Sequence, residues 1–131
     1  MTIELRHPLS GDEPRLRALF TEGFGDEGFT DLFFRTGYGP ERCLAAFNGE
    51  LLAALHWFDC ALEGKRVAYI YGIAAFKRCR GLGIGSRLIR AALAELETLG
   101  YEAVFLVPAR ESLFGLSLIH ISEPTRRYAI S

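Results

Sequence analysis

The stretch that decides the fold runs from Tyr69 to Leu93 and reads YIYGIAAFKRCRGLGIGSRLIRAAL. Its first part is rich in aromatic and β-branched residues, which is typical of a strand. A basic cluster at Lys77, Arg78 and Arg80 precedes closely spaced glycines, and apolar residues then recur at helical spacing. The stretch therefore predicts a strand, an anion-binding turn and a helix.

The composition limits what this stretch can belong to. The chain has 131 residues, 50% of them hydrophobic, which suits one globular domain with a buried core. Its formal net charge of -1 gives no general attraction to nucleic acid or to an anionic membrane. No apolar run reaches the roughly 20 residues of a membrane span, and the N-terminus lacks a signal peptide. We therefore expect a soluble, cytoplasmic protein with no nucleic-acid or membrane partner.

The cysteines, Cys43, Cys60 and Cys79, are odd in number and show no metal-ligand spacing. We therefore expect reduced thiols and no metal site. Cys79 stands between basic neighbours, where it is either a reactive thiol or a small, half-buried structural one. The second interpretation is favoured.

Two short helices are expected before the strands. Residues 2–6 alternate between apolar and polar side chains, which predicts a first strand. Ser10 is expected to cap a first helix that is ended by Gly23 and Gly25. Asp26 is expected to begin a second helix, which Gly37, Gly39 and Pro40 stop.

Residues 42–75 predict a three-stranded antiparallel meander. Its first turn contains Asn48-Gly49, which is typical of a hairpin, and its second lies at residues 63–65. Residues 102–108 form a nearly unbroken apolar run after the helix. Because a helix crossover leads to it, this last strand should lie parallel to the strand before the helix.

Three phosphate-binding motifs compete for the glycine turn. A dinucleotide fingerprint would need a glycine where Ser86 stands, and a P-loop would need a lysine that the turn lacks. The pattern R-x-x-G-x-G fits without exception, at Arg80, Gly83 and Gly85. Its main-chain N–H groups and the helix N-terminus would hold a pyrophosphate. A glycine loop that only connects strand to helix is the structural alternative.

The motif in this context, with the element order β-α-α-β-β-β-α-β, resembles the GNAT superfamily of acetyl-CoA-dependent N-acetyltransferases. The segments LFTEGFGDEGFTDLFF, YIYGIAAFKRCRGLGIGSRL and LVPARESLF are similar to a bacterial branch of mostly unassigned substrate. The resemblance covers residues 2–116 and implies an α/β (α+β) fold, three-layer α/β/α with a mixed, mostly antiparallel sheet. It also implies that an amine attacks the thioester of acetyl-CoA directly.

The resemblance assigns the acetyl-CoA contacts residue by residue. The pantetheine arm would pair with the main chain of Ile73, Ala74 and Ala75. Arg80 would add charge at the pyrophosphate, assisted by Arg78. The amides that hold the pyrophosphate would be those of Gly81, Leu82, Gly83, Ile84, Gly85 and Ser86. Lys77 departs from the family, which often has proline at this position.

The catalytic residues are left unassigned, because the family's usual tyrosine acid is absent. His56 and Tyr71 are the weak candidates. His56 and Trp57 are adjacent on a strand, so only one, Trp57, is expected to face the core. Tyr69 and Tyr71 share a face and either line the acceptor pocket or pack in the core. The acceptor would be a small-molecule or protein amine, and a homodimer is left open.

The end of the chain departs from the family most. After residues 112–115 the family continues with a tyrosine-containing segment and further strands, whereas this chain reads SLIHISEPTRRYAIS. That tail resembles a read-through peptide of sequencing adapters. We therefore expect residues 1–116 to be a GNAT domain that is incomplete at its C-terminus and residues 117–131 to be a non-native tail. Without the last helix and strands a sheet edge would be unpaired.

Two alternatives follow from the unusual tail. The tail itself could be a short helix or edge strand that patches the sheet. For the function, a non-catalytic acyl-CoA-binding or regulatory module, or an inactive fragment, is the alternative to an acetyltransferase.

Overall fold

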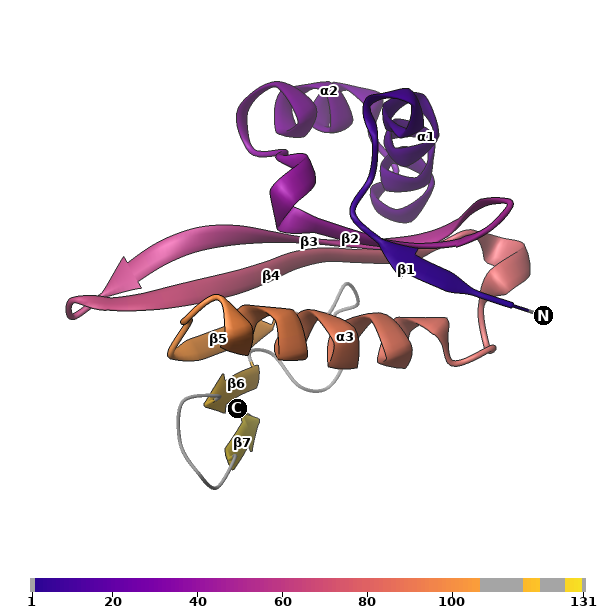
Figure 1. Cartoon of the computed structure of the whole chain (residues 1–131). Coiled ribbons are helices and arrows are strands. Elements are labelled where there is room, and N and C mark those ends of the chain that lie inside the picture. Colours follow the sequence, from indigo (N-terminus) through magenta and orange to yellow (C-terminus); the bar gives the residue numbers. More distant parts are fainter. Residues whose placement is uncertain (1, 107–116, 121–126, 131) are drawn as a thin grey trace.

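The chain folds into a sheet covered by helices on both faces, as described by a computed structural model for residues 2–106, 117–120 and 127–130 (Figure 1). The sheet has seven strands that neighbour one another in sequence order. Helices α1 (Glu13–Phe24) and α2 (Glu27–Thr36) cover one face, and α3 (Ile84–Thr98) covers the other. The predicted three-layer α/β/α arrangement is confirmed.

The first helix begins later than the sequence predicts. Ser10 does not cap α1 but starts a 3₁₀ turn, η1 (Ser10–Asp12), and Asp12 takes the N-cap position. The Asp12 carboxylate closes this turn, because it accepts a hydrogen bond of 2.8 Å from the N–H of Leu9. A side chain engaged in that way favours the turn over an earlier helix start.

The second helix begins and ends as predicted. The carboxylate of Asp26 accepts hydrogen bonds from the N–H groups of Gly28 and Phe29, which caps the N-terminus of α2. Gly25, with φ of 75°, ends α1 in the left-handed conformation that favours glycine, whereas Gly23, also expected to end it, lies inside the helix. Gly37 follows α2 at its other end.

The meander is also confirmed. Strand β1 (Glu4–Arg6) pairs antiparallel with β2 (Cys43–Asn48), which pairs with β3 (Glu50–Leu62) and then β4 (Lys65–Ala75). Strand β5 (Ala103–Leu106) runs parallel to β4, as the crossover through α3 requires. The predicted end of this strand at Pro108 lies outside the described residues.

A bulge in β4 changes which side chains face the helices. His56 pairs with Gly72 and Trp57 pairs with Ile70, so Tyr71 is an extra residue on β4. Tyr71 and Gly72 consequently both face α1 and α2. The rings of Tyr71 and Phe20 of α1 lie 6.4 Å apart, and a Cβ on Gly72 would lie 3.4 Å from the Phe20 ring.

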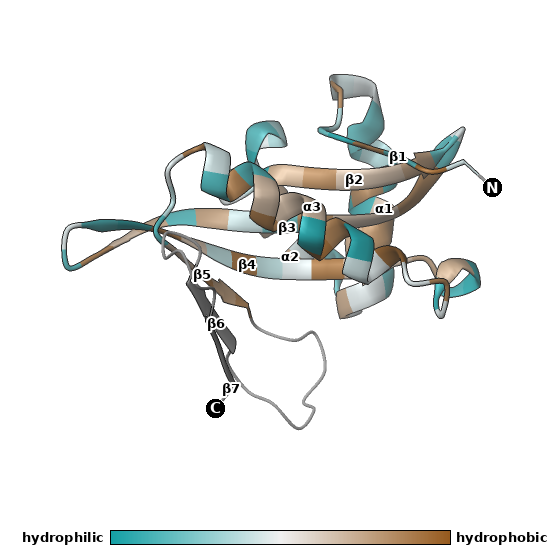
Figure 2. Ribbon diagram, turned by 60° about the horizontal axis from the view of Figure 1, so that its bottom comes forward, coloured by the Kyte–Doolittle hydropathy of each residue, from teal (hydrophilic) through white to brown (hydrophobic). Residues whose placement is uncertain are grey.

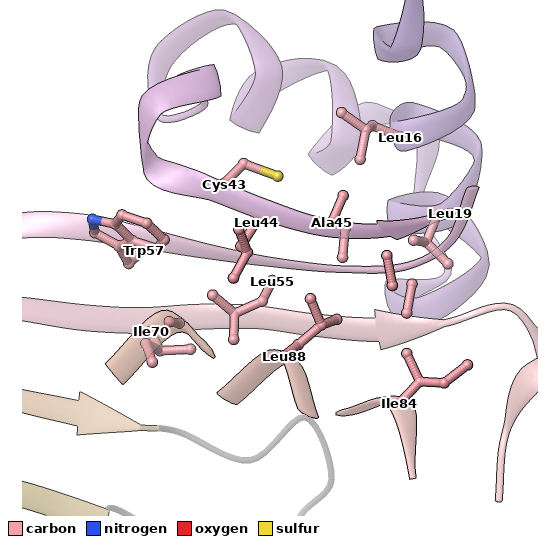
Figure 3. Close-up of a cluster of buried hydrophobic side chains, with 14 of the residues drawn as sticks. Leu16, Leu19, Cys43, Leu44, Ala45, Leu55, Trp57, Ile70, Ile84 and Leu88 are labelled. Atoms are coloured by element: carbon pink, nitrogen blue, oxygen red, sulfur yellow. The ribbon is translucent and has the colours of Figure 1, made fainter. Parts of the chain in front are cut away.

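His56 and Trp57 are both buried, with 5% and 2% of their surfaces exposed. The prediction that only one of them would face a core is wrong, because the sheet has a core on each face. His56 faces the aromatic side chains of α1 and α2. Trp57 lies in the other core with Leu55, Ile70 and Leu88 (Figure 3).

Two rows of alanines cross the sheet at one level, one on each face. The row facing α1 consists of the paired residues Ala45, Ala54 and Ala74. The row facing α3 consists of Ala46, Ala53 and Ala75. Gly23 of α1 lies against the first row, where a Cβ would come within 3.0 Å of the Ala74 Cβ. Side chains this small let the helices approach the sheet closely.

The tail extends the sheet beyond β5. Strand β6 (Ser117–His120) pairs antiparallel with β5, and β7 (Arg127–Ile130) pairs antiparallel with β6. The tail strands thus pair with main-chain groups that β5 would otherwise leave open, and the described edge moves to β7. Residues 112–115 and the expected domain boundary at Leu116 lie outside the described residues.

Hydrophobic residues gather on the parts of β2, β3 and β4 that lie under the helices, whereas the hairpin between β3 and β4 ends in hydrophilic residues (Figure 2). Leu88 and Leu96 of α3 are fully buried in this core. Within the part of the chain that the structure describes, none of the helices has the length and hydropathy needed to cross a membrane.

Candidate functional site

A cleft of about 340 Å³ lies between the end of β4 and the start of α3. Its lining includes Ile73, Ala74, Ala75, Arg80 and Gly85, all of them predicted cofactor residues. The sequence did not indicate the other two lining residues, Gly23 of α1 and Ala53 of β3, because no local signal connects them with the glycine turn.

A larger hollow of about 560 Å³ lies between α1 and α2. Glu22, Glu27 and Asp31 contribute to its lining, together with Arg17, and none of the predicted site residues does. We place the site in the smaller cleft, because the glycine turn and the free strand edge meet there.

Strand β4 continues past its parallel neighbour. Its described pairing with β5 runs as far as Ile70, opposite Leu106, whereas β4 itself continues to Ala75. Among the described residues, nothing pairs with the last part of β4 on this side. Within residues 2–106, 117–120 and 127–130 the cleft is therefore bordered by an open strand edge.

The direction of the main-chain groups shows which residues can use this edge. The N–H of Phe76 donates a hydrogen bond of 3.0 Å to the carbonyl of Leu52 in β3. Because successive residues of a strand alternate, the main-chain groups of Ala74 point to β3, and those of Ile73 and Ala75 point into the cleft. Two of the three predicted strand residues thus offer main-chain groups to an extended ligand.

The glycine turn leads from β4 through a 3₁₀ turn, η3 (Lys77–Cys79), into α3. Gly81 and Gly83 have φ of 85° and 75°, which other residues adopt only with strain. The first bond of the helix joins the N–H of Arg87 to the carbonyl of Gly83. From Gly83 to Ser86, no N–H finds an acceptor in the described part of the chain, as is usual at a helix N-terminus. This end of α3 can bind an anion.

Gly85 leaves room for a ligand in the cleft. A Cβ built on this residue would meet nothing within 4 Å, so packing inside the protein does not require a glycine here. Its backbone φ is not in the left-handed region either. The space that a side chain would fill is open to a phosphate group, which fits the predicted pyrophosphate site.

Arg80 bridges the mouth of the cleft. Its Nε donates a hydrogen bond of 3.2 Å to the carbonyl of Ala75, and its Nη2 lies 3.9 Å from Oε2 of Glu22. The same Glu22 oxygen accepts a hydrogen bond of 3.0 Å from the N–H of Lys77. Glu22 therefore fixes both the turn and Arg80, a role that no sequence signal indicated. Arg78, the expected additional charge, instead pairs with Glu50.

The remaining predicted residues of the turn differ in exposure. The side chain of Leu82 is exposed, and that of Ile84 is buried in the core beside Leu88 (Figure 3). Only the main chain of Ile84 is thus available to a ligand. Ser86 is exposed at the start of the helix.

His56 is enclosed by aromatic rings. Its ring lies between 5.1 Å and 6.0 Å from those of Phe20, Phe33, Phe34 and Tyr38. The Nδ1 atom is buried without a hydrogen-bond partner. Burial lowers the pKa of His56 to about 3, so the ring is neutral at neutral pH. These surroundings favour packing over proton transfer.

Tyr71 is half-buried at the bulge. Burial, and to a smaller extent the neighbouring Tyr69, raise the pKa of the Tyr71 hydroxyl. The group therefore stays protonated at neutral pH and can act as a hydrogen-bond donor or an acid.

Cys43 and Cys79 are buried free thiols, and Cys60 is an exposed one. In the described part of the chain, no group of three or more His, Cys, Asp or Glu residues is placed to hold a metal ion.

The sequence matches the Acetyltransferase (GNAT) family over residues 13–113. The chain belongs to this family. The match runs from the start of α1 past the end of β5 and includes the whole cleft. No curated protein matches the chain.

Solved structures of GNAT proteins share the fold. The GNAT N-acetyltransferase YhbS from Escherichia coli, in complex with CoA, is 20% identical with a TM-score of 0.70, over 80% of this chain and 62% of that one. A GNAT acetyltransferase from Brucella melitensis, in complex with acetyl-CoA, is 16% identical with a TM-score of 0.67, over 99% of this chain and 95% of that one.

An aminoglycoside acetyltransferase from an uncultured soil metagenomic sample is 21% identical with a TM-score of 0.61, over 86% of this chain and 83% of that one. This GNAT chain thus spans less than two thirds of the Escherichia coli protein but most of the other two. At such identities these likenesses show the fold alone.

Proposed function

We propose that the chain is an N-acetyltransferase that transfers the acetyl group of acetyl-CoA to an amine by direct attack. The observation that carries this proposal is the edge of β4 that the described residues leave open, beside the N-terminus of α3, whose N–H groups have no acceptor among those residues. Together they suit a long ligand with a pyrophosphate. Membership of the GNAT family supports acyl transfer from an acyl-CoA. The complex of the Brucella melitensis protein with acetyl-CoA supports acetyl as the acyl group.

Different residues of the cleft would bind different parts of acetyl-CoA. The N–H groups from Gly83 to Ser86 would hold the pyrophosphate, and Arg80 would add its charge after leaving the Ala75 carbonyl. Ile73 and Ala75 would pair with the amide groups of the pantetheine arm. Bound acetyl-CoA supplies the activated acyl group. The protein accelerates transfer mainly by holding the two reactants together.

Tyr71 is the proposed acid. Tyr71 lies on β4 next to Ile70, the last residue whose pairing with β5 is described, and its protonated hydroxyl could give its proton to the departing thiolate. No basic side chain needs to be assigned to deprotonate the amine, since water can accept that proton.

The test is a calorimetric titration of the chain with acetyl-CoA. Substitution Gly85→Leu should abolish binding at millimolar ligand, because the new side chain fills the cleft without straining the backbone. The matched control is Gly11→Leu, since a Cβ there also meets nothing within 4 Å and Gly11 lies in η1. Failure of the unsubstituted chain to bind at millimolar acetyl-CoA refutes the proposal, as does equal binding by both variants.

A non-catalytic acyl-CoA-binding module is the second candidate. The observation that favours it is the enclosure of His56, which leaves the described residues without an obvious base on the central strands. The two candidates differ in thiol release. Amine-dependent release of CoA thiol excludes the module, whereas tight binding without release from any amine supports it.

A further inference from the structure

Half-exposed aromatic rings form a continuous surface on the face of the sheet that α1 and α2 only partly cover. We call this surface the aromatic wall; it consists of Phe24, Phe29, Phe58, Tyr69 and Tyr71. Phe29 is 37% exposed and the other four are partly exposed. The ring of Tyr71 lies 6.4 Å from Phe24, 6.4 Å from Phe29, 5.2 Å from Phe58 and 6.2 Å from Tyr69. Each ring thus contacts the same central tyrosine.

The wall begins where the cleft ends. Tyr71 directly follows Ile70, the last residue of β4 whose pairing with β5 is described. Two residues further along the same strand is Ile73, whose main-chain groups point into the cleft. A reactant that packs on the wall is therefore next to the strand edge proposed to hold the pantetheine arm.

The wall is apolar and uncharged. Among the described residues, neither Tyr69 nor Tyr71 has a hydrogen-bond partner for its hydroxyl. Several carboxylates of the neighbouring helices already have partners. Glu22 accepts from Lys77, Asp26 caps α2, and Asp31 pairs with Arg35. Among the described residues Glu27 of α2 has no partner, but it lines the hollow between α1 and α2 and is not part of the wall. The wall itself therefore offers no counter-charge to an acceptor with several positive charges.

We propose that the acceptor is a primary amine attached to an aromatic or similarly flat apolar group. This group packs on the aromatic wall and brings the amine to the thioester beside Tyr71. The proposal rests on the acetyl transfer proposed above. The amine nitrogen bonds to the acetyl carbon and loses a proton to water, the carbon–sulfur bond breaks, and the thiolate takes up a proton, which leaves an amide and free CoA.

The test compares amines by the release of CoA thiol from acetyl-CoA. Phenethylamine and tryptamine should react with kcat/KM at least about tenfold above that of spermidine or kanamycin. Substitution Phe29→Ala should raise KM for phenethylamine about tenfold and leave kcat nearly unchanged, because it removes a binding ring away from the reacting atoms. The control is Leu99→Ala, an exposed leucine at the far end of α3.

The outcomes separate the acceptor class from the transfer itself. Thiol release that is fastest with spermidine or kanamycin overturns the aromatic acceptor and leaves acetyl transfer standing. Equal KM values for Phe29→Ala and Leu99→Ala overturn it too. Binding of acetyl-CoA without thiol release from any amine overturns both proposals at once.

Discussion

Acid should destabilise the protein through His56 in particular. The side chain is 5% exposed, and its Nδ1 has no hydrogen-bond partner in the described residues. Burial lowers its pKa from 6.5 to about 3 in the folded chain. In the unfolded chain the ring titrates normally. Below the pKa that His56 has in the unfolded chain, the unfolded state binds a proton that the folded state does not bind. Folding stability is therefore lost as the pH falls toward the pKa of His56 in the folded chain.

The size of the effect follows from that difference in pKa. Each pH unit between the two values costs about 1.4 kcal/mol of unfolding free energy. Going from about pH 7.5 to about pH 4.5 should cost about 3 kcal/mol through this one group. That is a large share of the roughly 5–15 kcal/mol that stabilises an ordinary domain.

Urea unfolding at a series of pH values measures this loss. The matched variant is His56→Leu, which has a similar volume and removes the titrating ring while the other histidines and the carboxylates remain. Their contributions cancel in the difference between the two proteins. Unfolding free energies that fall in parallel for both proteins as the pH drops would refute the argument, because His56 would then contribute nothing to the acid sensitivity.

Four substitutions test other parts of the structure. Gly83→Ala should lower the unfolding free energy in urea by about 1 kcal/mol, because φ is 75° there. Glu22→Gln should tighten acetyl-CoA binding about threefold at low salt, since Arg80 loses its ion pair while the N–H of Lys77 keeps an acceptor. Calorimetric titration at high salt should show a smaller difference in affinity, because salt screens the charge of Arg80. Leu88→Ala should cost about 2–5 kcal/mol in urea unfolding, because Leu88 is fully buried. Tyr71→Phe should lower kcat for thiol release about a hundredfold with KM nearly unchanged, if the hydroxyl is the acid.

Much of the fold could be predicted because its signals are local. Glycines, capping residues and apolar periodicity lie close together in the chain, and they gave the element order, the hairpin at Asn48-Gly49 and the cap at Asp26. The prediction that Ser10 caps the first helix is wrong for a local reason as well. The carboxylate of Asp12 competes for the same turn, and sequence alone does not rank the two.

The candidate site was predictable on one of its sides only. The glycine turn and the end of β4 are contiguous in sequence, so their residues could be named in advance. Glu22 and Gly23 reach the cleft from α1 through tertiary packing, which leaves no pattern in the sequence. The bulge at Tyr71 depends on register between β3 and β4. Register is a property of the pair of strands, so neither strand shows it alone.

The alanine rows make the shape of the cleft sensitive to residues that never touch a ligand. Because Gly23 packs on Ala74, methyl groups set the distance between α1 and the sheet. That distance also fixes the position of Glu22, which precedes Gly23 in α1 and accepts a hydrogen bond from Lys77. An enlarged side chain at Ala54, in the middle of the same row, would lift the helix and pull Glu22 from the N–H of Lys77. A mutational map of ligand affinity should therefore contain a second group of sensitive positions away from the ligand, the alanines of this row. Their common property is that no side chain larger than a methyl group fits there.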